Sequence, residues 1–347
     1  MKFTAIKPIY WLQFLLISTW FATLNAASLP IQGMKPFELP TWFKTSFLDI
    51  KEDVQEAKTA NKRVILFFEQ SNCPYCAHFI QTNFSNPKIQ EYIQKHFDII
   101  SINLWGDREI TNANSLGIPN PISEKALCAK LNIWATPTIL FLDEYGAAVL
   151  RLNGHYDPDN FMLAMRYVAE KQETKMSMSE FFAVSQQQQS QGTLIAEDFF
   201  ALPPYDLRSS IIKKPLMVVF EEPGSKASER LHKEVLQHPK TIKQLQSFHV
   251  IQLDVRADIP LILPNGKKQT TQAWIKMLRL NTFPTVLLFA KGKEILRLDA
   301  MFKAFHFQAL LSYVASGAYR TQLNIQRYLQ TYTENLQKQG VQINIWH

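Results

Sequence analysis

Two cysteines separated by two residues are the part of this sequence best suited to chemistry. The motif reads Cys73-Pro74-Tyr75-Cys76 and follows Val64–Phe68, an apolar run typical of a strand buried on both faces. A helix is expected from the cysteines to about Phe84, so Cys73 would stand at its positive, N–H-rich end. A thiolate is stabilised in such a place, while Cys76 lies one turn further on and can close a disulfide. The motif therefore predicts thiol–disulfide exchange, in which Cys73 attacks a substrate disulfide and Cys76 resolves the mixed disulfide.

A proline further along the chain is the second candidate site element. Thr136-Pro137 directly precedes Thr138–Leu142, an apolar run that predicts a strand. If this peptide bond is cis, the backbone of Thr136 would lie beside the sulfurs, ready to pair with a substrate strand. The alternative is an ordinary proline that leads into a strand. We expect Pro74, Tyr75, Thr136 and Pro137 to contact the substrate.

The positions of the three cysteines argue against several other chemistries. A zinc site needs about four ligands, and only His78 and Cys128 stand near the motif, so no metal site is predicted. Covalent haem attachment needs a histidine directly after the second cysteine, where Ala77 stands. A structural disulfide that closes so short a loop would stabilise little. We predict that Cys128 is a buried, inert thiol, with a redox partner as the alternative. No cofactor is expected.

The N-terminus has the three parts of an export signal. Lys2 and Lys7 give a positive start, Ile9–Phe21 is mostly apolar, and the segment closes on small residues at Ala26-Ala27. We predict a cleaved signal and a periplasmic protein; an uncleaved membrane anchor is the alternative. The formal net charge is +7, but the basic residues are scattered rather than gathered in a stripe, so no nucleic-acid partner is predicted.

The remainder of the 347-residue chain contains a repeat. Three pairs of segments correspond in order: Lys62–Glu69 with Lys214–Glu221, Thr136-Pro137-Thr138 with Phe283-Pro284-Thr285, and Leu150–Leu152 with Leu296–Leu298. Each copy has the periodicities of a β-α-β-α-β-β-α unit. The predicted fold class is therefore α/β, with two tandem copies that each have a central mixed sheet flanked by helices.

The predicted organisation has five parts. A signal peptide (1–27) precedes the first domain (28–172), a polar linker (173–213), the second domain (214–320), and a C-terminal helix and tail (321–347). The second copy carries Ser225-Lys226-Ala227-Ser228 where the first has its cysteines, so it cannot exchange disulfides. Its Phe283-Pro284 element remains. We expect this domain to bind a partner or orient the first domain; a repeat kept only for packing is the alternative.

The order strand, Cys-x-x-Cys, helix, with a distal Thr-Pro-Thr, resembles the thioredoxin superfamily over residues 47–172 and, without the cysteines, 214–320. Three phrases are more narrowly similar to exported SoxW-like thioredoxins found with sulfur-oxidation genes: Phe67-Phe68-Glu69-Gln70, Leu104-Trp105-Gly106-Asp107 and Tyr313–Tyr319. The resemblance implies thioredoxin-like folds, a redox-active dithiol and a membrane electron donor. Two positions depart from the family. Asn72 replaces the usual tryptophan before the first cysteine, and Phe67 replaces a buried acid, with Glu69 on the same strand face.

The predicted function is that of a periplasmic thiol–disulfide oxidoreductase, a disulfide reductase or exchanger whose partners are protein thiols and disulfides. The alternative is a non-catalytic, protein-binding or chaperone-like protein, which the cysteine-free second copy would favour. Disulfide reductase activity distinguishes these two classes.

Overall fold

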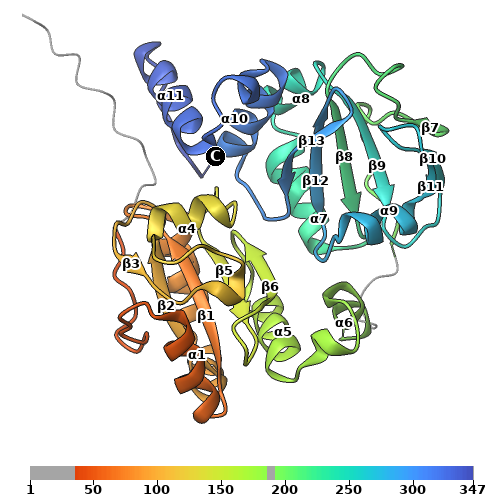
Figure 1. Cartoon of the computed structure of the whole chain (residues 1–347). Coiled ribbons are helices and arrows are strands. Elements are labelled where there is room, and N and C mark those ends of the chain that lie inside the picture. The colour runs from red at the N-terminus through yellow and green to blue at the C-terminus, as the bar shows by residue number, and fades with distance from the viewer. Residues whose placement is uncertain (1–35, 186–191, 347) are drawn as a thin grey trace, which may run out of the picture.

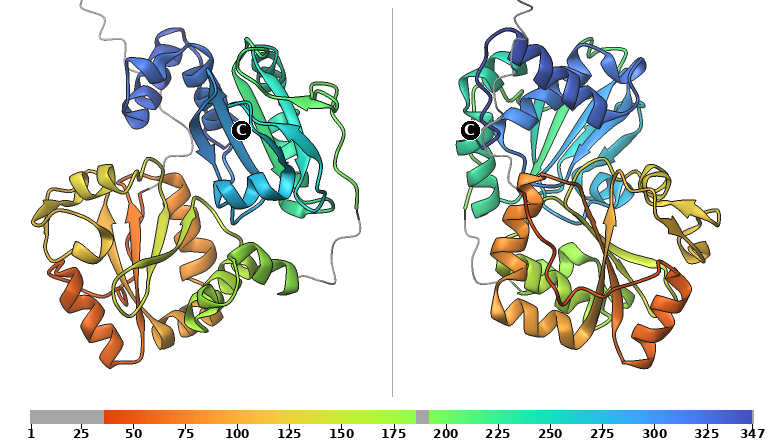
Figure 2. Two further views of the ribbon diagram at one scale, coloured as in Figure 1. Left: turned by 45° about the vertical axis from the view of Figure 1, so that its right-hand side comes forward. Right: turned by 90° about the vertical axis from the view of Figure 1, so that its left-hand side faces the viewer.

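The structure is a computed structural model that describes residues 36–185 and 192–346 (Figure 1). The predicted export signal at 1–27 and most of the Gln-rich stretch at 186–191 lie outside these residues. Two α/β domains lie side by side (Figures 1 and 2). Within residues 36–185 and 192–346, no helix combines the length and apolarity needed to cross a membrane.

The first domain is built on a four-stranded sheet in the order β2-β1-β5-β6. Its strands are β1 (Arg63–Glu69), β2 (Phe97–Asn103), β5 (Thr138–Leu142) and β6 (Ala148–Asn153). β1 runs parallel to β2 and antiparallel to β5, so the sheet is mixed, as predicted. All seven residues of β1 are buried, because helices cover both faces of the sheet. Alternate residues of β1 enter two separate cores: Ile65 and Phe67 on one face, Leu66 and Phe68 on the other.

The helices of the first domain are α1 (Ile50–Thr59), α2 (Pro74–Phe79), α3 (Pro87–His96), α4 (Glu124–Lys130), α5 (Pro158–Ala169) and α6 (Met178–Ser185). The helix expected after the cysteines reaches Phe84, but its last five residues form a π-helix, η1 (Ile80–Phe84). The segment 105–121, predicted as a loop, also carries a 3-10 turn, η2 (Asn114–Leu116), and a two-residue strand, β3 (Glu109–Ile110), paired with β4 (Ile122–Ser123). Two residues are too few for a strand periodicity to be recognised.

The second domain repeats the architecture, with a sheet in the order β13-β12-β8-β9. Its strands are β8 (Leu216–Glu221), β9 (His249–Asp254), β12 (Thr285–Ala290) and β13 (Lys293–Leu298). The helices are α7 (Lys226–Leu231), η4 (His232–Leu236), α8 (Pro239–Leu245), α9 (Thr271–Leu278), α10 (Ala304–Ala315) and α11 (Ile325–Lys338). A small sheet is added by β7 (Tyr205–Asp206), β10 (Pro260–Ile262) and β11 (Lys268–Thr270). The predicted tandem duplication is confirmed, down to a π-helical turn after the first helix of each copy.

The segments between and after the two sheets pack onto the domains. Met178 and Phe181 of α6 belong to the same core of the first domain as Ile65 and Phe67, and Leu207 belongs to one core of the second domain. The apolar residues Ile325, Tyr328 and Leu329 of α11 pack against the other core of the second domain. The domain boundaries proposed from the sequence remain predictions. The region predicted as a linker, 173–213, includes residues that pack into the core of one domain or the other.

Matching segments of the two domains meet each other. By the repeat, Asn153 corresponds to Asp299 and His155 to Met301. Asn153 Nδ2 donates to the two carboxylate oxygens of Asp299 at 2.9 and 3.0 Å, and His155 forms an antiparallel β-bridge with Met301. Gly154 has φ +73°, and a Cβ there would come within 2.5 Å of the Ala300 Cβ, so glycine allows this close approach. Since each residue meets its own counterpart, a local two-fold axis relates the domains at this contact.

Candidate active site

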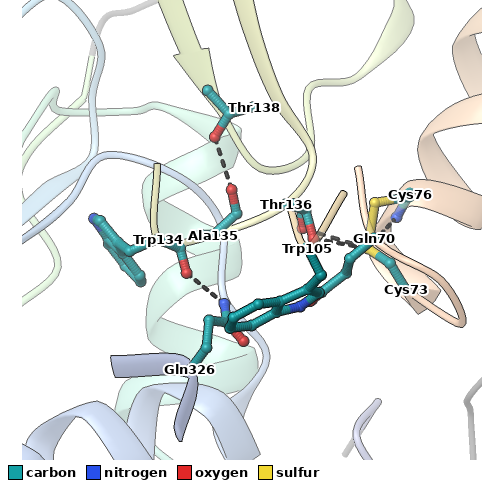
Figure 3. Close-up of a disulfide and its surroundings, with 9 residues drawn as sticks. All are labelled: Gln70, Cys73, Cys76, Trp105, Trp134, Ala135, Thr136, Thr138 and Gln326. Atoms are coloured by element: carbon teal, nitrogen blue, oxygen red, sulfur yellow. Dashed lines mark hydrogen bonds between the residues drawn. A yellow bond between two sulfur atoms is a disulfide. The ribbon is translucent and has the colours of Figure 1, made fainter. Parts of the chain in front are cut away.

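The predicted pair Cys73 and Cys76 forms a disulfide at the start of α2, with the two Cα atoms 5.2 Å apart (Figure 3). Cys73 is the N-cap residue of α2, and its Sγ accepts a hydrogen bond from the Cys76 N–H at 3.0 Å. Cys73 is 3% exposed and Cys76 is completely buried. The sulfur nearer the surface is therefore the one that the helix N-terminus can stabilise as a thiolate.

The turn from β1 into α2 explains the residue that precedes the first cysteine. Asn72 has φ +58°, in the left-handed region. Asparagine enters this region far more readily than a bulky side chain does. The departure from tryptophan at this position therefore agrees with the backbone geometry of the turn.

Thr136 lies directly beside Cys73 Sγ, and the Thr136–Pro137 peptide bond is cis. The Thr136 hydroxyl donates to Cys73 Sγ at 3.3 Å, and the Thr136 carbonyl oxygen lies 3.5 Å from the same atom (Figure 3). The sequence singled out the backbone of Thr136 but not its hydroxyl. Two donors, the Cys76 N–H and the Thr136 O–H, therefore converge on Cys73 Sγ, and hydrogen bonds to a charged acceptor are stronger than those to a neutral one.

A tryptophan is hydrogen-bonded to the turn that carries the cysteines. Trp105 follows β2, is 47% exposed, and donates its indole N–H to the Gln70 side chain at 2.9 Å (Figure 3). The sequence had indicated Trp105 only as part of a family phrase, not as a site residue. Its position could have been found from the parallel pairing of β1 and β2, because the carboxyl ends of neighbouring parallel strands meet at one edge of the sheet.

Tyr75, predicted to contact the substrate, contacts the second domain in this structure. Its hydroxyl accepts the Lys303 N–H at 3.2 Å and lies 3.0 Å from His306 Nδ1. Its ring packs against that of Trp346, with centroids 5.5 Å apart. Burial raises the pKa of the Tyr75 hydroxyl and lowers the pKa of His306 to about 4, so both groups are neutral at physiological pH. A phenol that keeps its proton can donate it to the imidazole nitrogen.

The second domain also contacts the loop that carries Thr136. The ring of Trp134 stacks on that of Phe302, with centroids 5.7 Å apart and 6° between the planes. The Gln326 side chain of α11 donates to the Trp134 carbonyl oxygen (Figure 3). The α11 helix therefore packs on its own domain and also reaches the first domain. The second domain therefore rests on two elements of the site, the cysteine turn and the Thr136 loop.

The sequence singled out three further titratable residues with the motif: Glu69, Cys128 and His78. Burial, followed by the charge of Glu124, raises the pKa of Glu69. The same two causes raise the pKa of Cys128, which is 1% exposed, to about 12, so it remains a thiol near neutral pH. The ring of His78 packs on those of His155 and Trp346, at centroid distances of 4.5 and 5.6 Å.

The second domain keeps the geometry of the site without its sulfurs. Ser225 caps α7, and its hydroxyl oxygen accepts the Ser228 N–H at 3.4 Å, as Cys73 does for Cys76. The Phe283–Pro284 peptide is cis, like Thr136–Pro137. No group of three or more His, Cys, Asp or Glu side chains suited to a metal ion occurs within the described ranges 36–185 and 192–346.

Comparison with known sequences decides the family. The sequence model of the thioredoxin-like domain matches residues 50–169 and again residues 211–315. The chain belongs to the thioredoxin-like domain family. It carries the domain twice, which confirms the predicted superfamily and tandem fold. The narrower likeness to SoxW-like thioredoxins remains a prediction.

Several solved structures are similar to parts of this thioredoxin-like chain. A thioredoxin-fold protein from Helicobacter pylori shares 20% identity over 36% of this chain and 80% of its own, with a TM-score of 0.30. A thioredoxin from Thermus thermophilus shares 23% identity over 35% of this chain and 83% of its own, with a TM-score of 0.27. The periplasmic thioredoxin SoxS from Paracoccus pantotrophus shares 15% identity over 32% of this chain and 99% of its own, with a TM-score of 0.22. No curated protein sequence matches the chain.

Proposed function

We propose that this thioredoxin-like chain is a thiol–disulfide oxidoreductase acting on protein disulfides, with Cys73 as nucleophile and Cys76 as resolving thiol. The observation that carries the proposal is the position of Cys73 Sγ. It accepts hydrogen bonds from the Cys76 N–H and the Thr136 hydroxyl at the start of a helix. These donors stabilise a thiolate, which is both the attacking and the leaving form of sulfur in exchange.

The reaction follows from this arrangement. With both cysteines reduced, the Cys73 thiolate attacks one sulfur of a substrate disulfide, forms a mixed disulfide and releases the other substrate sulfur as a thiolate. The Cys76 thiol then loses its proton and attacks Cys73 Sγ. This closes the Cys73–Cys76 disulfide and releases the second substrate thiolate. The substrate gains two electrons and the enzyme loses two, so a separate reductant must restore the dithiol.

The contacts of the second domain favour one side for substrate approach. Tyr75 and Trp134 are in contact with His306 and Phe302 of the second domain. Trp105, which is hydrogen-bonded to Gln70 in the turn before Cys73, remains 47% exposed. We therefore propose that a substrate segment reaches Cys73 past Trp105, alongside the Thr136–Pro137 element.

Trapping experiments test the assigned roles. Cys76→Ser should accumulate mixed disulfides with substrate proteins, because the resolving attack is lost, while Cys73→Ser should accumulate none. Cys128→Ser is the matched control and should behave like the wild type in an insulin reduction assay. Equal trapping by the Cys73 and Cys76 variants would contradict the roles. Absence of insulin reduction by the wild type would favour the non-catalytic, chaperone-like alternative.

We further propose that the protein works in the periplasm and receives electrons from a membrane donor. The support for export is the sequence of residues 1–27, which has the three parts of an export signal. The support for a donor is the reaction itself, since a separate reductant must restore the dithiol. An alkaline phosphatase fusion to residues 1–40 should be active, since that enzyme needs an oxidising compartment. Replacing Ile9–Phe21 by polar residues should abolish the activity. Retention of activity by that variant would contradict export through this segment.

A further inference from the structure

A pocket lies between the domains, over the place where the second domain would have its active site. Its volume is about 90 Å³, whereas a single buried water needs about 10–15 Å³. The second domain contributes Ala227, Phe283 and Pro284 to its wall, and the first contributes His155, Tyr156 and Asn160. The three residues of the second domain belong to the counterparts of the cysteine turn and of the cis-proline loop.

The local two-fold axis relates this pocket to the surroundings of Tyr75. By the repeat, Tyr75 corresponds to Ala227 and His306 corresponds to Asn160. Tyr75 and Ala227 are both the second residue of their helices, α2 and α7. In the first domain, the Tyr75 side chain fills the space between the two domains, and its hydroxyl is hydrogen-bonded to His306 of the second domain. In the second domain, the methyl group of Ala227 leaves the corresponding space open.

We propose that the pocket binds the side chain of a tyrosine from a polypeptide partner. Tyr75 shows that a tyrosyl group fits at the equivalent position in the first domain. There it lies between the start of α2 and residues Lys303 and His306 of the second domain. The proposal goes beyond the oxidoreductase function, because it involves neither cysteine.

The lining of the pocket has the chemistry that a phenol requires. Leu231, Phe283 and Phe302 provide apolar walls for an aromatic ring. His155 also lines the pocket, and its buried Nδ1 has no hydrogen-bond partner among the described residues. Burial, followed by repulsion from His78, lowers the pKa of His155 to about 4, so the imidazole is neutral and can accept a phenolic proton. A tyrosine offers one apolar ring and one hydroxyl, which matches this combination.

A polypeptide source is favoured by the backbone at the pocket wall. The cis Phe283–Pro284 peptide stands directly before β12. Extended peptides commonly bind through main-chain hydrogen bonds to backbone that is not already paired in a sheet, and Phe283 and Pro284 lie outside the paired residues of β12. A tyrosine carried on an extended segment could therefore pair its backbone beside Phe283 while its ring enters the pocket.

The test is binding of N-acetyl-Gly-Tyr-Gly-amide to the full mature chain carrying ¹³C-labelled methionine methyl groups. Met301 lines the pocket and Met178 is buried in the first core, so they serve as reporter and control. We expect a saturable shift of the Met301 methyl signal and none of Met178. The corresponding leucine peptide should bind at least about tenfold more weakly, because leucine has neither the aromatic ring nor the hydroxyl that would bond to His155. A Met301 signal that does not move overturns the proposal.

Variants and a small phenol complete the test. Ala227→Tyr should fill the pocket from within and weaken the tyrosine peptide at least about tenfold, while Ala227→Ser should bind like the wild type. Unchanged insulin reduction by Ala227→Tyr would show that the variant is folded. If it does not fold, the Met301 signal of the wild type still decides. Binding of p-cresol as tight as that of the tyrosine peptide would overturn the polypeptide source, and equal binding by Ala227→Tyr would overturn the site.

Discussion

The Thr136 hydroxyl offers a direct test of how the site sets its redox properties. Thr136→Val keeps the shape of the side chain but removes the donor that lies 3.3 Å from Cys73 Sγ. The loss falls mainly on the reduced protein, because a thiolate accepts a hydrogen bond more strongly than a disulfide sulfur does. The variant should therefore be harder to reduce than the wild type, with a more negative reduction potential.

The expected size follows from the geometry. Hydrogen bonds to charged groups contribute about 1.5–3 kcal/mol. The contact is long, and sulfur is a weak acceptor, so the lower end of about 1.5 kcal/mol applies. For a two-electron couple, this free energy corresponds to about 30 mV. The Cys76 N–H, the second donor, is unaffected by the change.

The potential is measured by equilibrating the protein in glutathione buffers and trapping free thiols. Thr136→Ser is the matched control, because it keeps the hydroxyl, and its potential should stay within about 10 mV of the wild type. A valine variant with the wild-type potential would refute the role of the hydroxyl. Serine and valine variants that shift equally would show that side-chain shape, not the donor, sets the potential.

Three further predictions concern the surroundings of the site. In the folded protein at neutral pH, Cys128 should resist iodoacetamide and react only in urea, because burial raises its pKa to about 12; alkylation at the rate of a free thiol would contradict this. Tyr75→Phe should lower the free energy of unfolding in urea by about 1–3 kcal/mol, since its partners in the second domain lose their hydrogen bonds; an unchanged value would mean that the contact is not formed in solution. Burial opposes the charged form of His232, but Glu221 and Glu197 outweigh it and raise its pKa, so the ion pairs stabilise the protein below pH ~6.5 and are lost as pH rises through that raised pKa. The stabilities of wild type and His232→Gln in urea should therefore converge as the pH rises above about 6.5, and a constant difference would count against the charged histidine.

The part of the site that could be predicted from the sequence is local in the chain. The apolar run that became β1 leads directly into Cys73, and the N-cap position follows from where that helix begins. Thr136 and Pro137 were also identifiable, because they precede a strand that pairs with β1. The cis bond itself depended on surroundings that only the folded chain provides.

The contacts of Tyr75 could not be predicted from local patterns. Its partners Lys303 and His306 lie more than two hundred positions later, and they reach it only because the domains dock face to face. No periodicity within either copy encodes that docking. The repeat contained one indication: a glycine at 154 facing an alanine at 300 permits the close approach of the two segments.

The pairing of Asn153 with Asp299 and of His155 with Met301 resembles the interface of a symmetric dimer, but here both halves belong to one polypeptide. In a dimer of identical chains, every mutation appears twice, so a change that benefits one groove is imposed on the other. Joining the halves removes this constraint. The site of the first domain can keep the residues that disulfide exchange requires, while the corresponding site of the second domain accumulates substitutions and acquires a different function. The absence of a cysteine pair from the second copy can thus be read as specialisation, which the joining of the two halves in one chain permits.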